Sequence, residues 1–140
     1  FLDRKFSKTL AEQIVKDFDI STPSVNHEVK KLSGGNIQKV LLGREIWLAP
    51  KVLITAYPVR GLDIGASYNI YRVLNEQKKK GVAVLFIGED LDVRIRFSDR
   101  LMVIHNGEVV DIVDPRSVTK EDIGMMMLGH KPGEEGSEAV

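Results

Sequence analysis

The chain has 140 residues with 20 basic and 20 acidic side chains, so its net charge at neutral pH is zero, and nothing indicates a nucleic-acid partner. It contains no cysteine, which excludes disulfides and thiolate metal sites, and we expect no metal site. No apolar run approaches the roughly 18 residues that span a bilayer, and no signal peptide is visible, which favours a cytoplasmic protein.

The first 20 residues are predicted to form an amphipathic helix. Large apolar residues recur there at every fourth position, as expected of a helix that packs against a core or a partner. This stripe consists of Phe6, Leu10, Ile14 and Phe18. Residues 21–31 are polar and are predicted to form a loop.

The most informative stretch follows this loop and reads Leu32-Ser33-Gly34-Gly35-Asn36-Ile37-Gln38-Lys39-Val40. We expect Ser33 to cap a helix with its hydroxyl, and the two glycines allow a ligand to approach the backbone closely. A helix start attracts anions, so the stretch predicts a phosphate site, although a capped helix without a ligand remains open. The helix should end before Pro50 and bury Ile37, Val40, Leu41, Trp47 and Leu48.

A strand, a helix and a second strand are predicted next, and this order favours a parallel crossover. The first strand covers 51–56 and the helix covers 66–80, closed by Gly81. The second strand, 82–87, is a continuous apolar run, which is typical of a strand covered on both faces.

The remaining elements are a short helix over 91–97, a strand over 100–104 and a returning strand over 108–113. Asn106-Gly107 between the two strands is a strong hairpin signal. Thr119 should cap a final helix, in which three consecutive methionines, 125–127, are interpreted as a docking surface rather than a metal site.

Several of these stretches resemble motifs of ABC transporter ATPases, in the same order. Residues 32–40 resemble the signature, 52–58 the Walker B strand, 60–63 the D-loop and 86–91 the switch region, while Ser98-Asp99-Arg100 opens the following strand. The nearest resemblance is to the second nucleotide-binding domain of importers of simple sugars or nucleosides that carry two such domains in one chain.

This resemblance implies an α/β fold, namely a partial P-loop NTPase domain. It would contain a mostly parallel sheet flanked by helices, the end of the helical subdomain and a C-terminal β-hairpin. Residues 1–130 would form the C-terminal fragment of the domain, with the helical part over 1–48 and the catalytic-core part over 49–130. Residues 131–140 would form a disordered tail.

Two departures from the family pattern bear on catalysis. The Walker B positions that normally carry two carboxylates are Ala56 and Tyr57, which cannot bind a metal ion or accept a proton at neutral pH. The switch position, usually histidine, is Glu89. The phosphate-binding loop pattern is absent from this sequence, so we expect no catalytic residue and no ATP hydrolysis by the chain alone.

In the family, ATP lies between the phosphate loop of one domain and the signature of another. The resemblance therefore implies that Ser33, Gly34 and Gly35 contact ATP held with Mg²⁺ by a partner, with Asn36 and Gln38 in the same motif. Asp63 of the D-loop would couple the two sites, or would simply cap the helix at Ala66. No nucleotide is expected to bind the isolated fragment.

The expected partners are another ABC nucleotide-binding domain and transmembrane permease subunits, at the inner face of the cell membrane. Arg60 and the first helix are weaker interface candidates. A non-catalytic scaffold of a transporter complex is the alternative function, whereas a DNA-repair ATPase is disfavoured because residues 1–31 hold no sustained heptads. Because a sheet without all its strands has open edges, the isolated chain is expected to self-associate.

Overall fold

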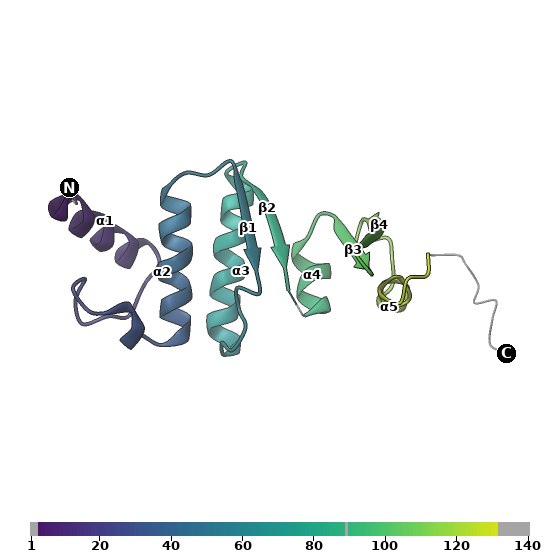
Figure 1. Ribbon diagram of the computed structural model, residues 1–140, viewed down its shortest axis with the longest axis horizontal. Coiled ribbons are helices and arrows are strands. Elements are labelled where there is room, and N and C mark those ends of the chain that lie inside the picture. Colours follow the sequence, from purple (N-terminus) through teal and green to yellow (C-terminus); the bar gives the residue numbers. More distant parts are fainter. Residues whose placement is uncertain (1–2, 89, 132–140) are drawn as a thin grey trace. The chain divides into compact units, whose positions relative to one another are not determined.

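A computed structural model describes residues 3–88 and 90–131 of the chain (Figure 1). The chain divides into two compact units, Phe1–Gly88 and Glu89–Val140, and each is described by itself. Glu89, the predicted switch position, lies outside the described residues, as does nearly all of the predicted tail. The predicted boundary between a helical part, 1–48, and a catalytic-core part, 49–130, is a different division and stays a prediction.

Residues 3–88 of the first unit form three helices, one 3₁₀ turn and two strands. In chain order these are α1 Arg4–Asp17, η1 Val29–Lys31, α2 Gly34–Trp47, β1 Val52–Ala56, α3 Ile64–Lys79 and β2 Ala83–Ile87. Helix α1 begins at Asp3, whose carboxylate accepts hydrogen bonds from the backbone N–H groups of Lys5 and Phe6. The predicted helices and strands of this part of the chain are thereby confirmed to within a few residues.

Helix α2 contacts both α1 and α3, and this decides which of its residues are buried. Leu42 and Gly43 are its buried residues, whereas Leu41, Trp47 and Leu48 are exposed. The predicted burial of these last three side chains was wrong, because a single apolar stripe was assumed for a helix that packs on two sides. Trp47 instead lies edge-on to Phe6 of α1, with ring centroids 5.5 Å apart.

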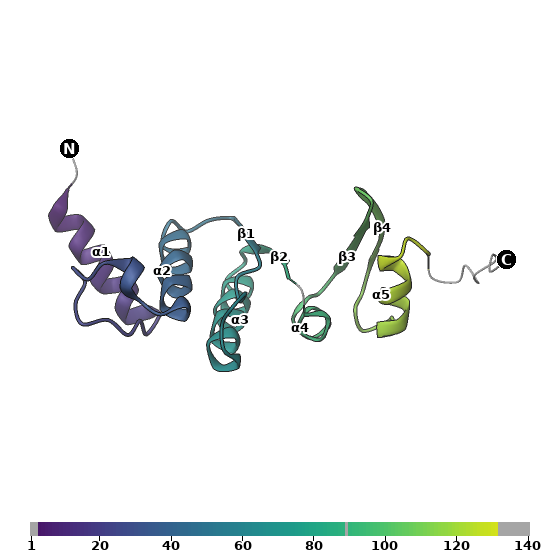
Figure 2. The same ribbon diagram turned by 60° about the horizontal axis from the view of Figure 1, so that its bottom comes forward.

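Strands β1 and β2 pair in parallel, with Val52 opposite Ala83 and Ala56 opposite Ile87. Leu53 of β1 forms a core with Leu42, Ile70 and Leu74, so helices α2 and α3 cover one face of this sheet (Figure 2). On the other face, Val52, Ile54, Leu85 and Ile87 are exposed. The prediction that β2 is covered on both faces is wrong for the described residues, because these helices supply only one covering layer.

The second unit packs a hairpin against helices. Its elements are α4 Leu91–Phe97, β3 Leu101–His105, β4 Glu108–Val113 and α5 Lys120–Met127. The turn residues Asn106 and Gly107 both have positive φ angles, 48° and 84°, as the predicted hairpin turn requires. The core consists of Leu101, Val103, Ile123 and Met126. Met126 is therefore a core residue, which corrects its interpretation as part of a docking surface.

The outer face of the hairpin also carries apolar side chains. Met102 lies opposite Ile112, and Ile104 lies opposite Val109, and all four are exposed. The expected self-association of the isolated chain is consistent with two such uncovered faces and stays a prediction. Among the described residues, no helix is both long enough and apolar enough to cross a membrane.

The hydrogen bonds at the start of α5 predict how the stability of the chain depends on pH. The carboxylate of Asp122 accepts from the Thr119 backbone N–H at 2.8 Å and from the Thr119 hydroxyl, and these bonds lower the pKa of Asp122 below its ordinary value of 3.8. A lowered pKa contributes stability that is complete above the ordinary value and is lost as the pH falls below it. We expect Asp122→Asn to be less stable than the wild type above pH 3.8, with a difference that shrinks at lower pH. Unfolding midpoints measured across this range check the expectation, and a difference that does not change with pH would contradict it.

Candidate nucleotide-contact site

Ser33 is the N-cap residue of α2 by position, as expected, but its hydroxyl does not cap the helix. Its side chain makes no capping hydrogen bond, so the predicted cap is wrong. Instead, the Ser33 hydroxyl oxygen accepts a hydrogen bond from Asn36 Nδ2 at 3.0 Å. Since the first amides of a helix have no partner within the helix, those of α2 remain available to an anion.

The signature glycines pack closely against the start of α3. A Cβ built on Gly35 would lie 3.2 Å from Ala66 Cβ, and one on Gly34 would lie 3.4 Å from Leu62 Cδ2. The absence of a side chain at Gly35 therefore serves helix packing as well as any approach by a ligand. The close contact joins the predicted signature to the predicted D-loop within one chain.

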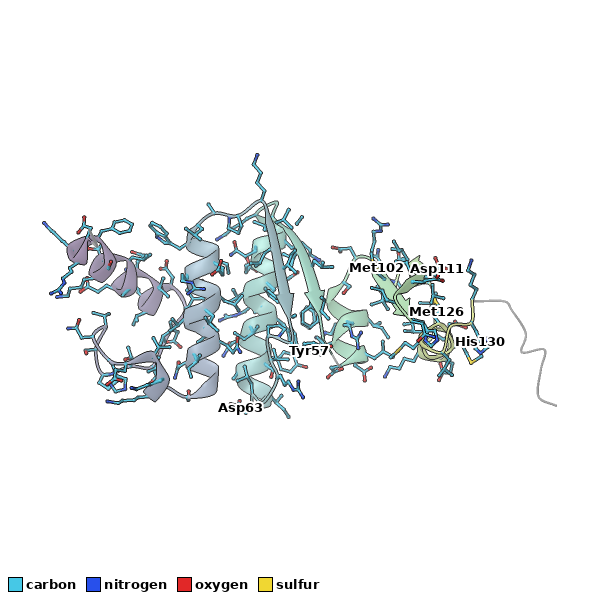
Figure 3. All side chains as sticks on the ribbon, in the orientation of Figure 1. Tyr57, Asp63, Met102, Asp111, Met126 and His130 are labelled. Atoms are coloured by element: carbon cyan, nitrogen blue, oxygen red, sulfur yellow. The ribbon has the colours of Figure 1, made fainter. Side chains whose placement is uncertain are left out.

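Asp63 is the N-cap of α3 (Figure 3). Its Oδ1 accepts from the Ala66 backbone N–H at 2.9 Å, which confirms the capping role left open by the sequence. The coupling role that the resemblance implies for Asp63 stays a prediction. The starts of α2 and α3 lie at the same end of the unit (Figure 1).

The turn at residues 19–21 is hydrogen-bonded to α2, and the sequence did not predict these contacts. Asp19 has a positive φ of 48°, and its carbonyl oxygen accepts from Lys39 Nζ at 2.7 Å. Two residues later, the Ser21 backbone N–H donates to Asn36 Oδ1 at 3.0 Å. Lys39 and Asn36 both lie in the recognised motif, but a partner so far along the chain leaves no local sequence signal.

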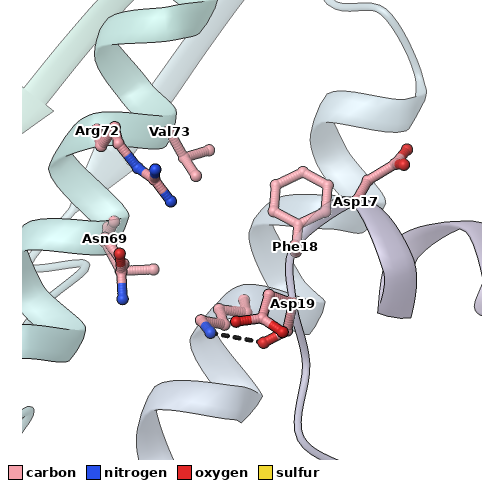
Figure 4. A pocket seen from close by; sticks show the side chains of 8 residues that line it. Asp17, Phe18, Asp19, Asn69, Arg72 and Val73 are labelled. Carbon is pink, nitrogen blue, oxygen red and sulfur yellow. Dashed lines mark hydrogen bonds between the residues drawn. The ribbon is translucent and has the colours of Figure 1, made fainter.

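These parts surround an open cavity of about 400 Å³. Its walls are the turn at 19–21, the start of α2 and the start of α3. The lining includes Ser33, Gly34, Gly35, Asn36 and Asp63, which the sequence predicted, whereas Gln38 is not part of it. A smaller cavity of about 70 Å³ lies beside it, between the end of α1 and α3, and shares Asp19, Lys39 and Asn69 (Figure 4).

The loop leading into the signature is held by ion pairs. Glu28 contacts Lys30 Nζ at 2.6 Å and Lys31 Nζ at 2.7 Å. Hydrogen bonds from Lys30 and then Lys31 lower the pKa of the Glu28 carboxyl group. These ion pairs are exposed and local to residues 28–31, so they contribute little to stability.

The Walker B positions lie where β1 ends. Ala56 is the last residue of β1, and Tyr57 follows with a φ of 50° and a side chain 44% exposed (Figure 3). The Tyr57 backbone N–H donates to the Ile87 carbonyl at 2.7 Å. A methyl group and a phenol provide no carboxylate for Mg²⁺, so these two positions do not fit that ion. Within residues 3–88 and 90–131, no group of three or more acidic, histidine or cysteine side chains could hold a metal ion.

The chain is similar to bacterial import ATP-binding proteins. It is 38% identical over 126 residues to the guanosine import ATP-binding protein NupO of Bacillus subtilis, covering 90% of this chain and 25% of the relative. It is 39% identical over 129 residues to the nucleoside import ATP-binding protein NupA of Lactococcus lactis, covering 92% and 26%. The ribose import ATP-binding protein RbsA of Streptococcus agalactiae is 37% identical over 131 residues, covering 94% and 27%. The chain thus spans about a quarter of the length of these relatives.

Solved structures of ABC transporter cassettes share the fold. The dimeric structure of a bacterial ABC transporter cassette superposes with a TM-score of 0.69 at 24% identity, covering 84% of this chain and 51% of that one. Another ATP-binding cassette of an ABC transporter gives a TM-score of 0.74 at 23% identity, covering 92% and 51%. No protein-family model matches the chain. The chain therefore belongs to the ABC transporter ATPase family and has the fold of about half of one cassette.

Proposed function

We propose that this chain is part of an ABC import ATP-binding protein for a simple sugar or a nucleoside. In this role it supplies the signature to an ATP molecule that a partner nucleotide-binding domain holds together with Mg²⁺. The names of the relatives support the class of transporter, with nucleoside and ribose importers at similar identity. Membrane permease subunits would hold the assembly at the inner face of the cell membrane.

The observation that carries the proposal is the geometry at the start of α2. An exposed serine hydroxyl, free helix amides and a nearby cap residue of α3 surround one open cavity. The serine hydroxyl and the helix amides can donate hydrogen bonds to a phosphate, and the helix start favours negative charge. Ser33, Gly34 and Gly35 are the proposed contacts, while Asp63 is proposed to link this site to the partner.

The chain's own Walker B strand is proposed to be inactive. Ala56 and Tyr57 provide neither a metal ligand nor a base, so no hydrolytic step is assigned to residues of this chain. The expected assembly is asymmetric, with one site that hydrolyses ATP and one that binds it or holds the two domains together.

The test is steady-state ATP hydrolysis by a full-length protein that carries this chain, wild type against Ser33→Arg. Arginine would fill the cavity and remove the hydroxyl donor, so turnover should fall by about 10²–10³-fold, as when a donor to a developing charge is removed. Ser117→Arg, at an exposed serine of the loop before α5 and outside the cavity, is the matched control and should retain turnover. Unchanged turnover in Ser33→Arg would sink the proposal and favour a non-catalytic scaffold, because a scaffold needs only the fold.

A further inference from the structure

The side-chain amide of Asn36 is hydrogen-bonded at both ends. Its Oδ1 accepts from the Ser21 backbone N–H at 3.0 Å, and its Nδ2 donates to Ser33 Oγ at 3.0 Å. Asn36 thus connects the turn before the signature to the serine at the start of α2. A residue whose amide is engaged in this way acts on its neighbours rather than on a distant ligand.

The orientation of this amide is fixed by the turn. A backbone N–H can only donate, so the Ser21 N–H requires the carbonyl end of Asn36 to face it. The opposite orientation would bring two donors together. The turn cannot readily move away, because Ile20 is buried and the Asp19 carbonyl is bonded to Lys39.

This orientation determines what Ser33 can do. Since Asn36 Nδ2 donates to Ser33 Oγ, the serine oxygen acts as an acceptor toward Asn36, and among the described residues its own hydrogen has no acceptor. A phosphate oxygen can only accept. We propose that Asn36 is a positioning residue that sets the hydrogen-bond direction of Ser33, so that the serine hydroxyl donates to a phosphate oxygen. The inference rests on the proposed function of Ser33.

The experiment is a double-mutant cycle in a full-length protein that carries this chain, with kcat and KM for ATP measured for each variant. Ser33→Ala should lower kcat/KM by about 10- to 100-fold, as expected when a hydrogen bond to a charged group is lost. Asn36→Ala should lower it by about 3- to 10-fold. In the Ser33→Ala background the same Asn36 change should cost less than about twofold, since there is no hydroxyl left to orient.

A purely structural role of Asn36 would give a different pattern. If the residue only anchored the turn, its loss would have the same effect with or without the Ser33 hydroxyl, and additive effects would overturn the inference. An Asn36→Ala variant with wild-type kinetics would overturn it as well. If the Ser33 variants themselves keep full turnover, the proposed function fails first, so the two failures are distinguishable.

An isosteric variant keeps the shape of the side chain, reverses the direction of its bond to Ser33 and adds a negative charge. Asn36→Asp still accepts from the Ser21 N–H, but its second oxygen can only accept from Ser33 and so takes up the serine hydrogen. We expect a loss in kcat/KM at least as large as that of Asn36→Ala. The unfolding transition, followed by the fluorescence of Trp47, should be unchanged. Asn75→Ala on α3, outside the cavity, is the matched control and should behave as the wild type. Activity of Asn36→Asp close to the wild type would contradict the direction proposed here.

Discussion

Replacement of Met126 by alanine should lower the free energy of unfolding of the second unit by about 2–5 kcal/mol. The Met126 side chain is 0% exposed and lies in a core with Leu101, Val103 and Ile123. Alanine would leave a cavity among these side chains and would lose the apolar contacts of the thioether chain. In a unit of this small size, a loss of this magnitude is a large part of the total stability.

The neighbouring methionine provides the control. Met125 is 42% exposed, so Met125→Ala should change stability by less than about 0.5 kcal/mol. Amide hydrogen exchange in β3 and α5 is the suitable measurement, because it reports on the second unit by itself. Equal effects of the two alanine variants would mean that Met126 is not a core residue.

Replacement of Gly43 by valine should destabilise the first unit by about 1–3 kcal/mol. A Cβ at this position would lie 2.6 Å from Ile14 Cγ2 and 3.0 Å from Phe18 Cδ2. Ile14 is itself buried and its branched carbon cannot swing aside as the end of a long side chain could. Helices α1 and α2 would therefore have to separate.

The single tryptophan, Trp47, makes this change measurable, since it lies in α2 and contacts Phe6 of α1. Urea unfolding followed by its fluorescence should show an earlier transition in Gly43→Val. The same substitution at Gly124 in α5, where a Cβ would meet no atom within 4 Å, should leave this transition unchanged. A Gly43→Val variant as stable as the wild type would show that the two helices do not pack in this way.

Local patterns determined most of the secondary structure. The strand β2, the Asn106-Gly107 turn and the cap at Thr119 depend on residues close together in the chain, and each is found as predicted, as is the cap at Asp63 that the sequence offered as one of two roles. The order of the motifs likewise identified the family, because each motif is a short run of residues that can be recognised without knowing which residues it contacts.

The sequence predictions failed where packing partners decide the outcome. Helix α2 was expected to bury one stripe, but contacts with α1 and α3 bury Leu42 and Gly43 and leave Leu48 exposed. Similarly, the composition of β2 indicates burial on both faces, whereas among the described residues helices α2 and α3 cover only one face of its sheet. An apolar side chain indicates a tendency to be buried and does not identify the surface that buries it.

The sequence by itself therefore predicted which residues form the signature, the D-loop and the degenerate Walker B strand, and these assignments stay predictions. Only the tertiary structure decided which hydrogen bonds the side chains of Ser33 and Asn36 make. The Ser33 hydroxyl makes no capping bond and instead accepts from Asn36 Nδ2, while the Ser21 N–H of a separate turn orients the Asn36 amide. A hydrogen bond between residues distant in sequence depends on where the folded backbone brings them, so no local pattern could predict it.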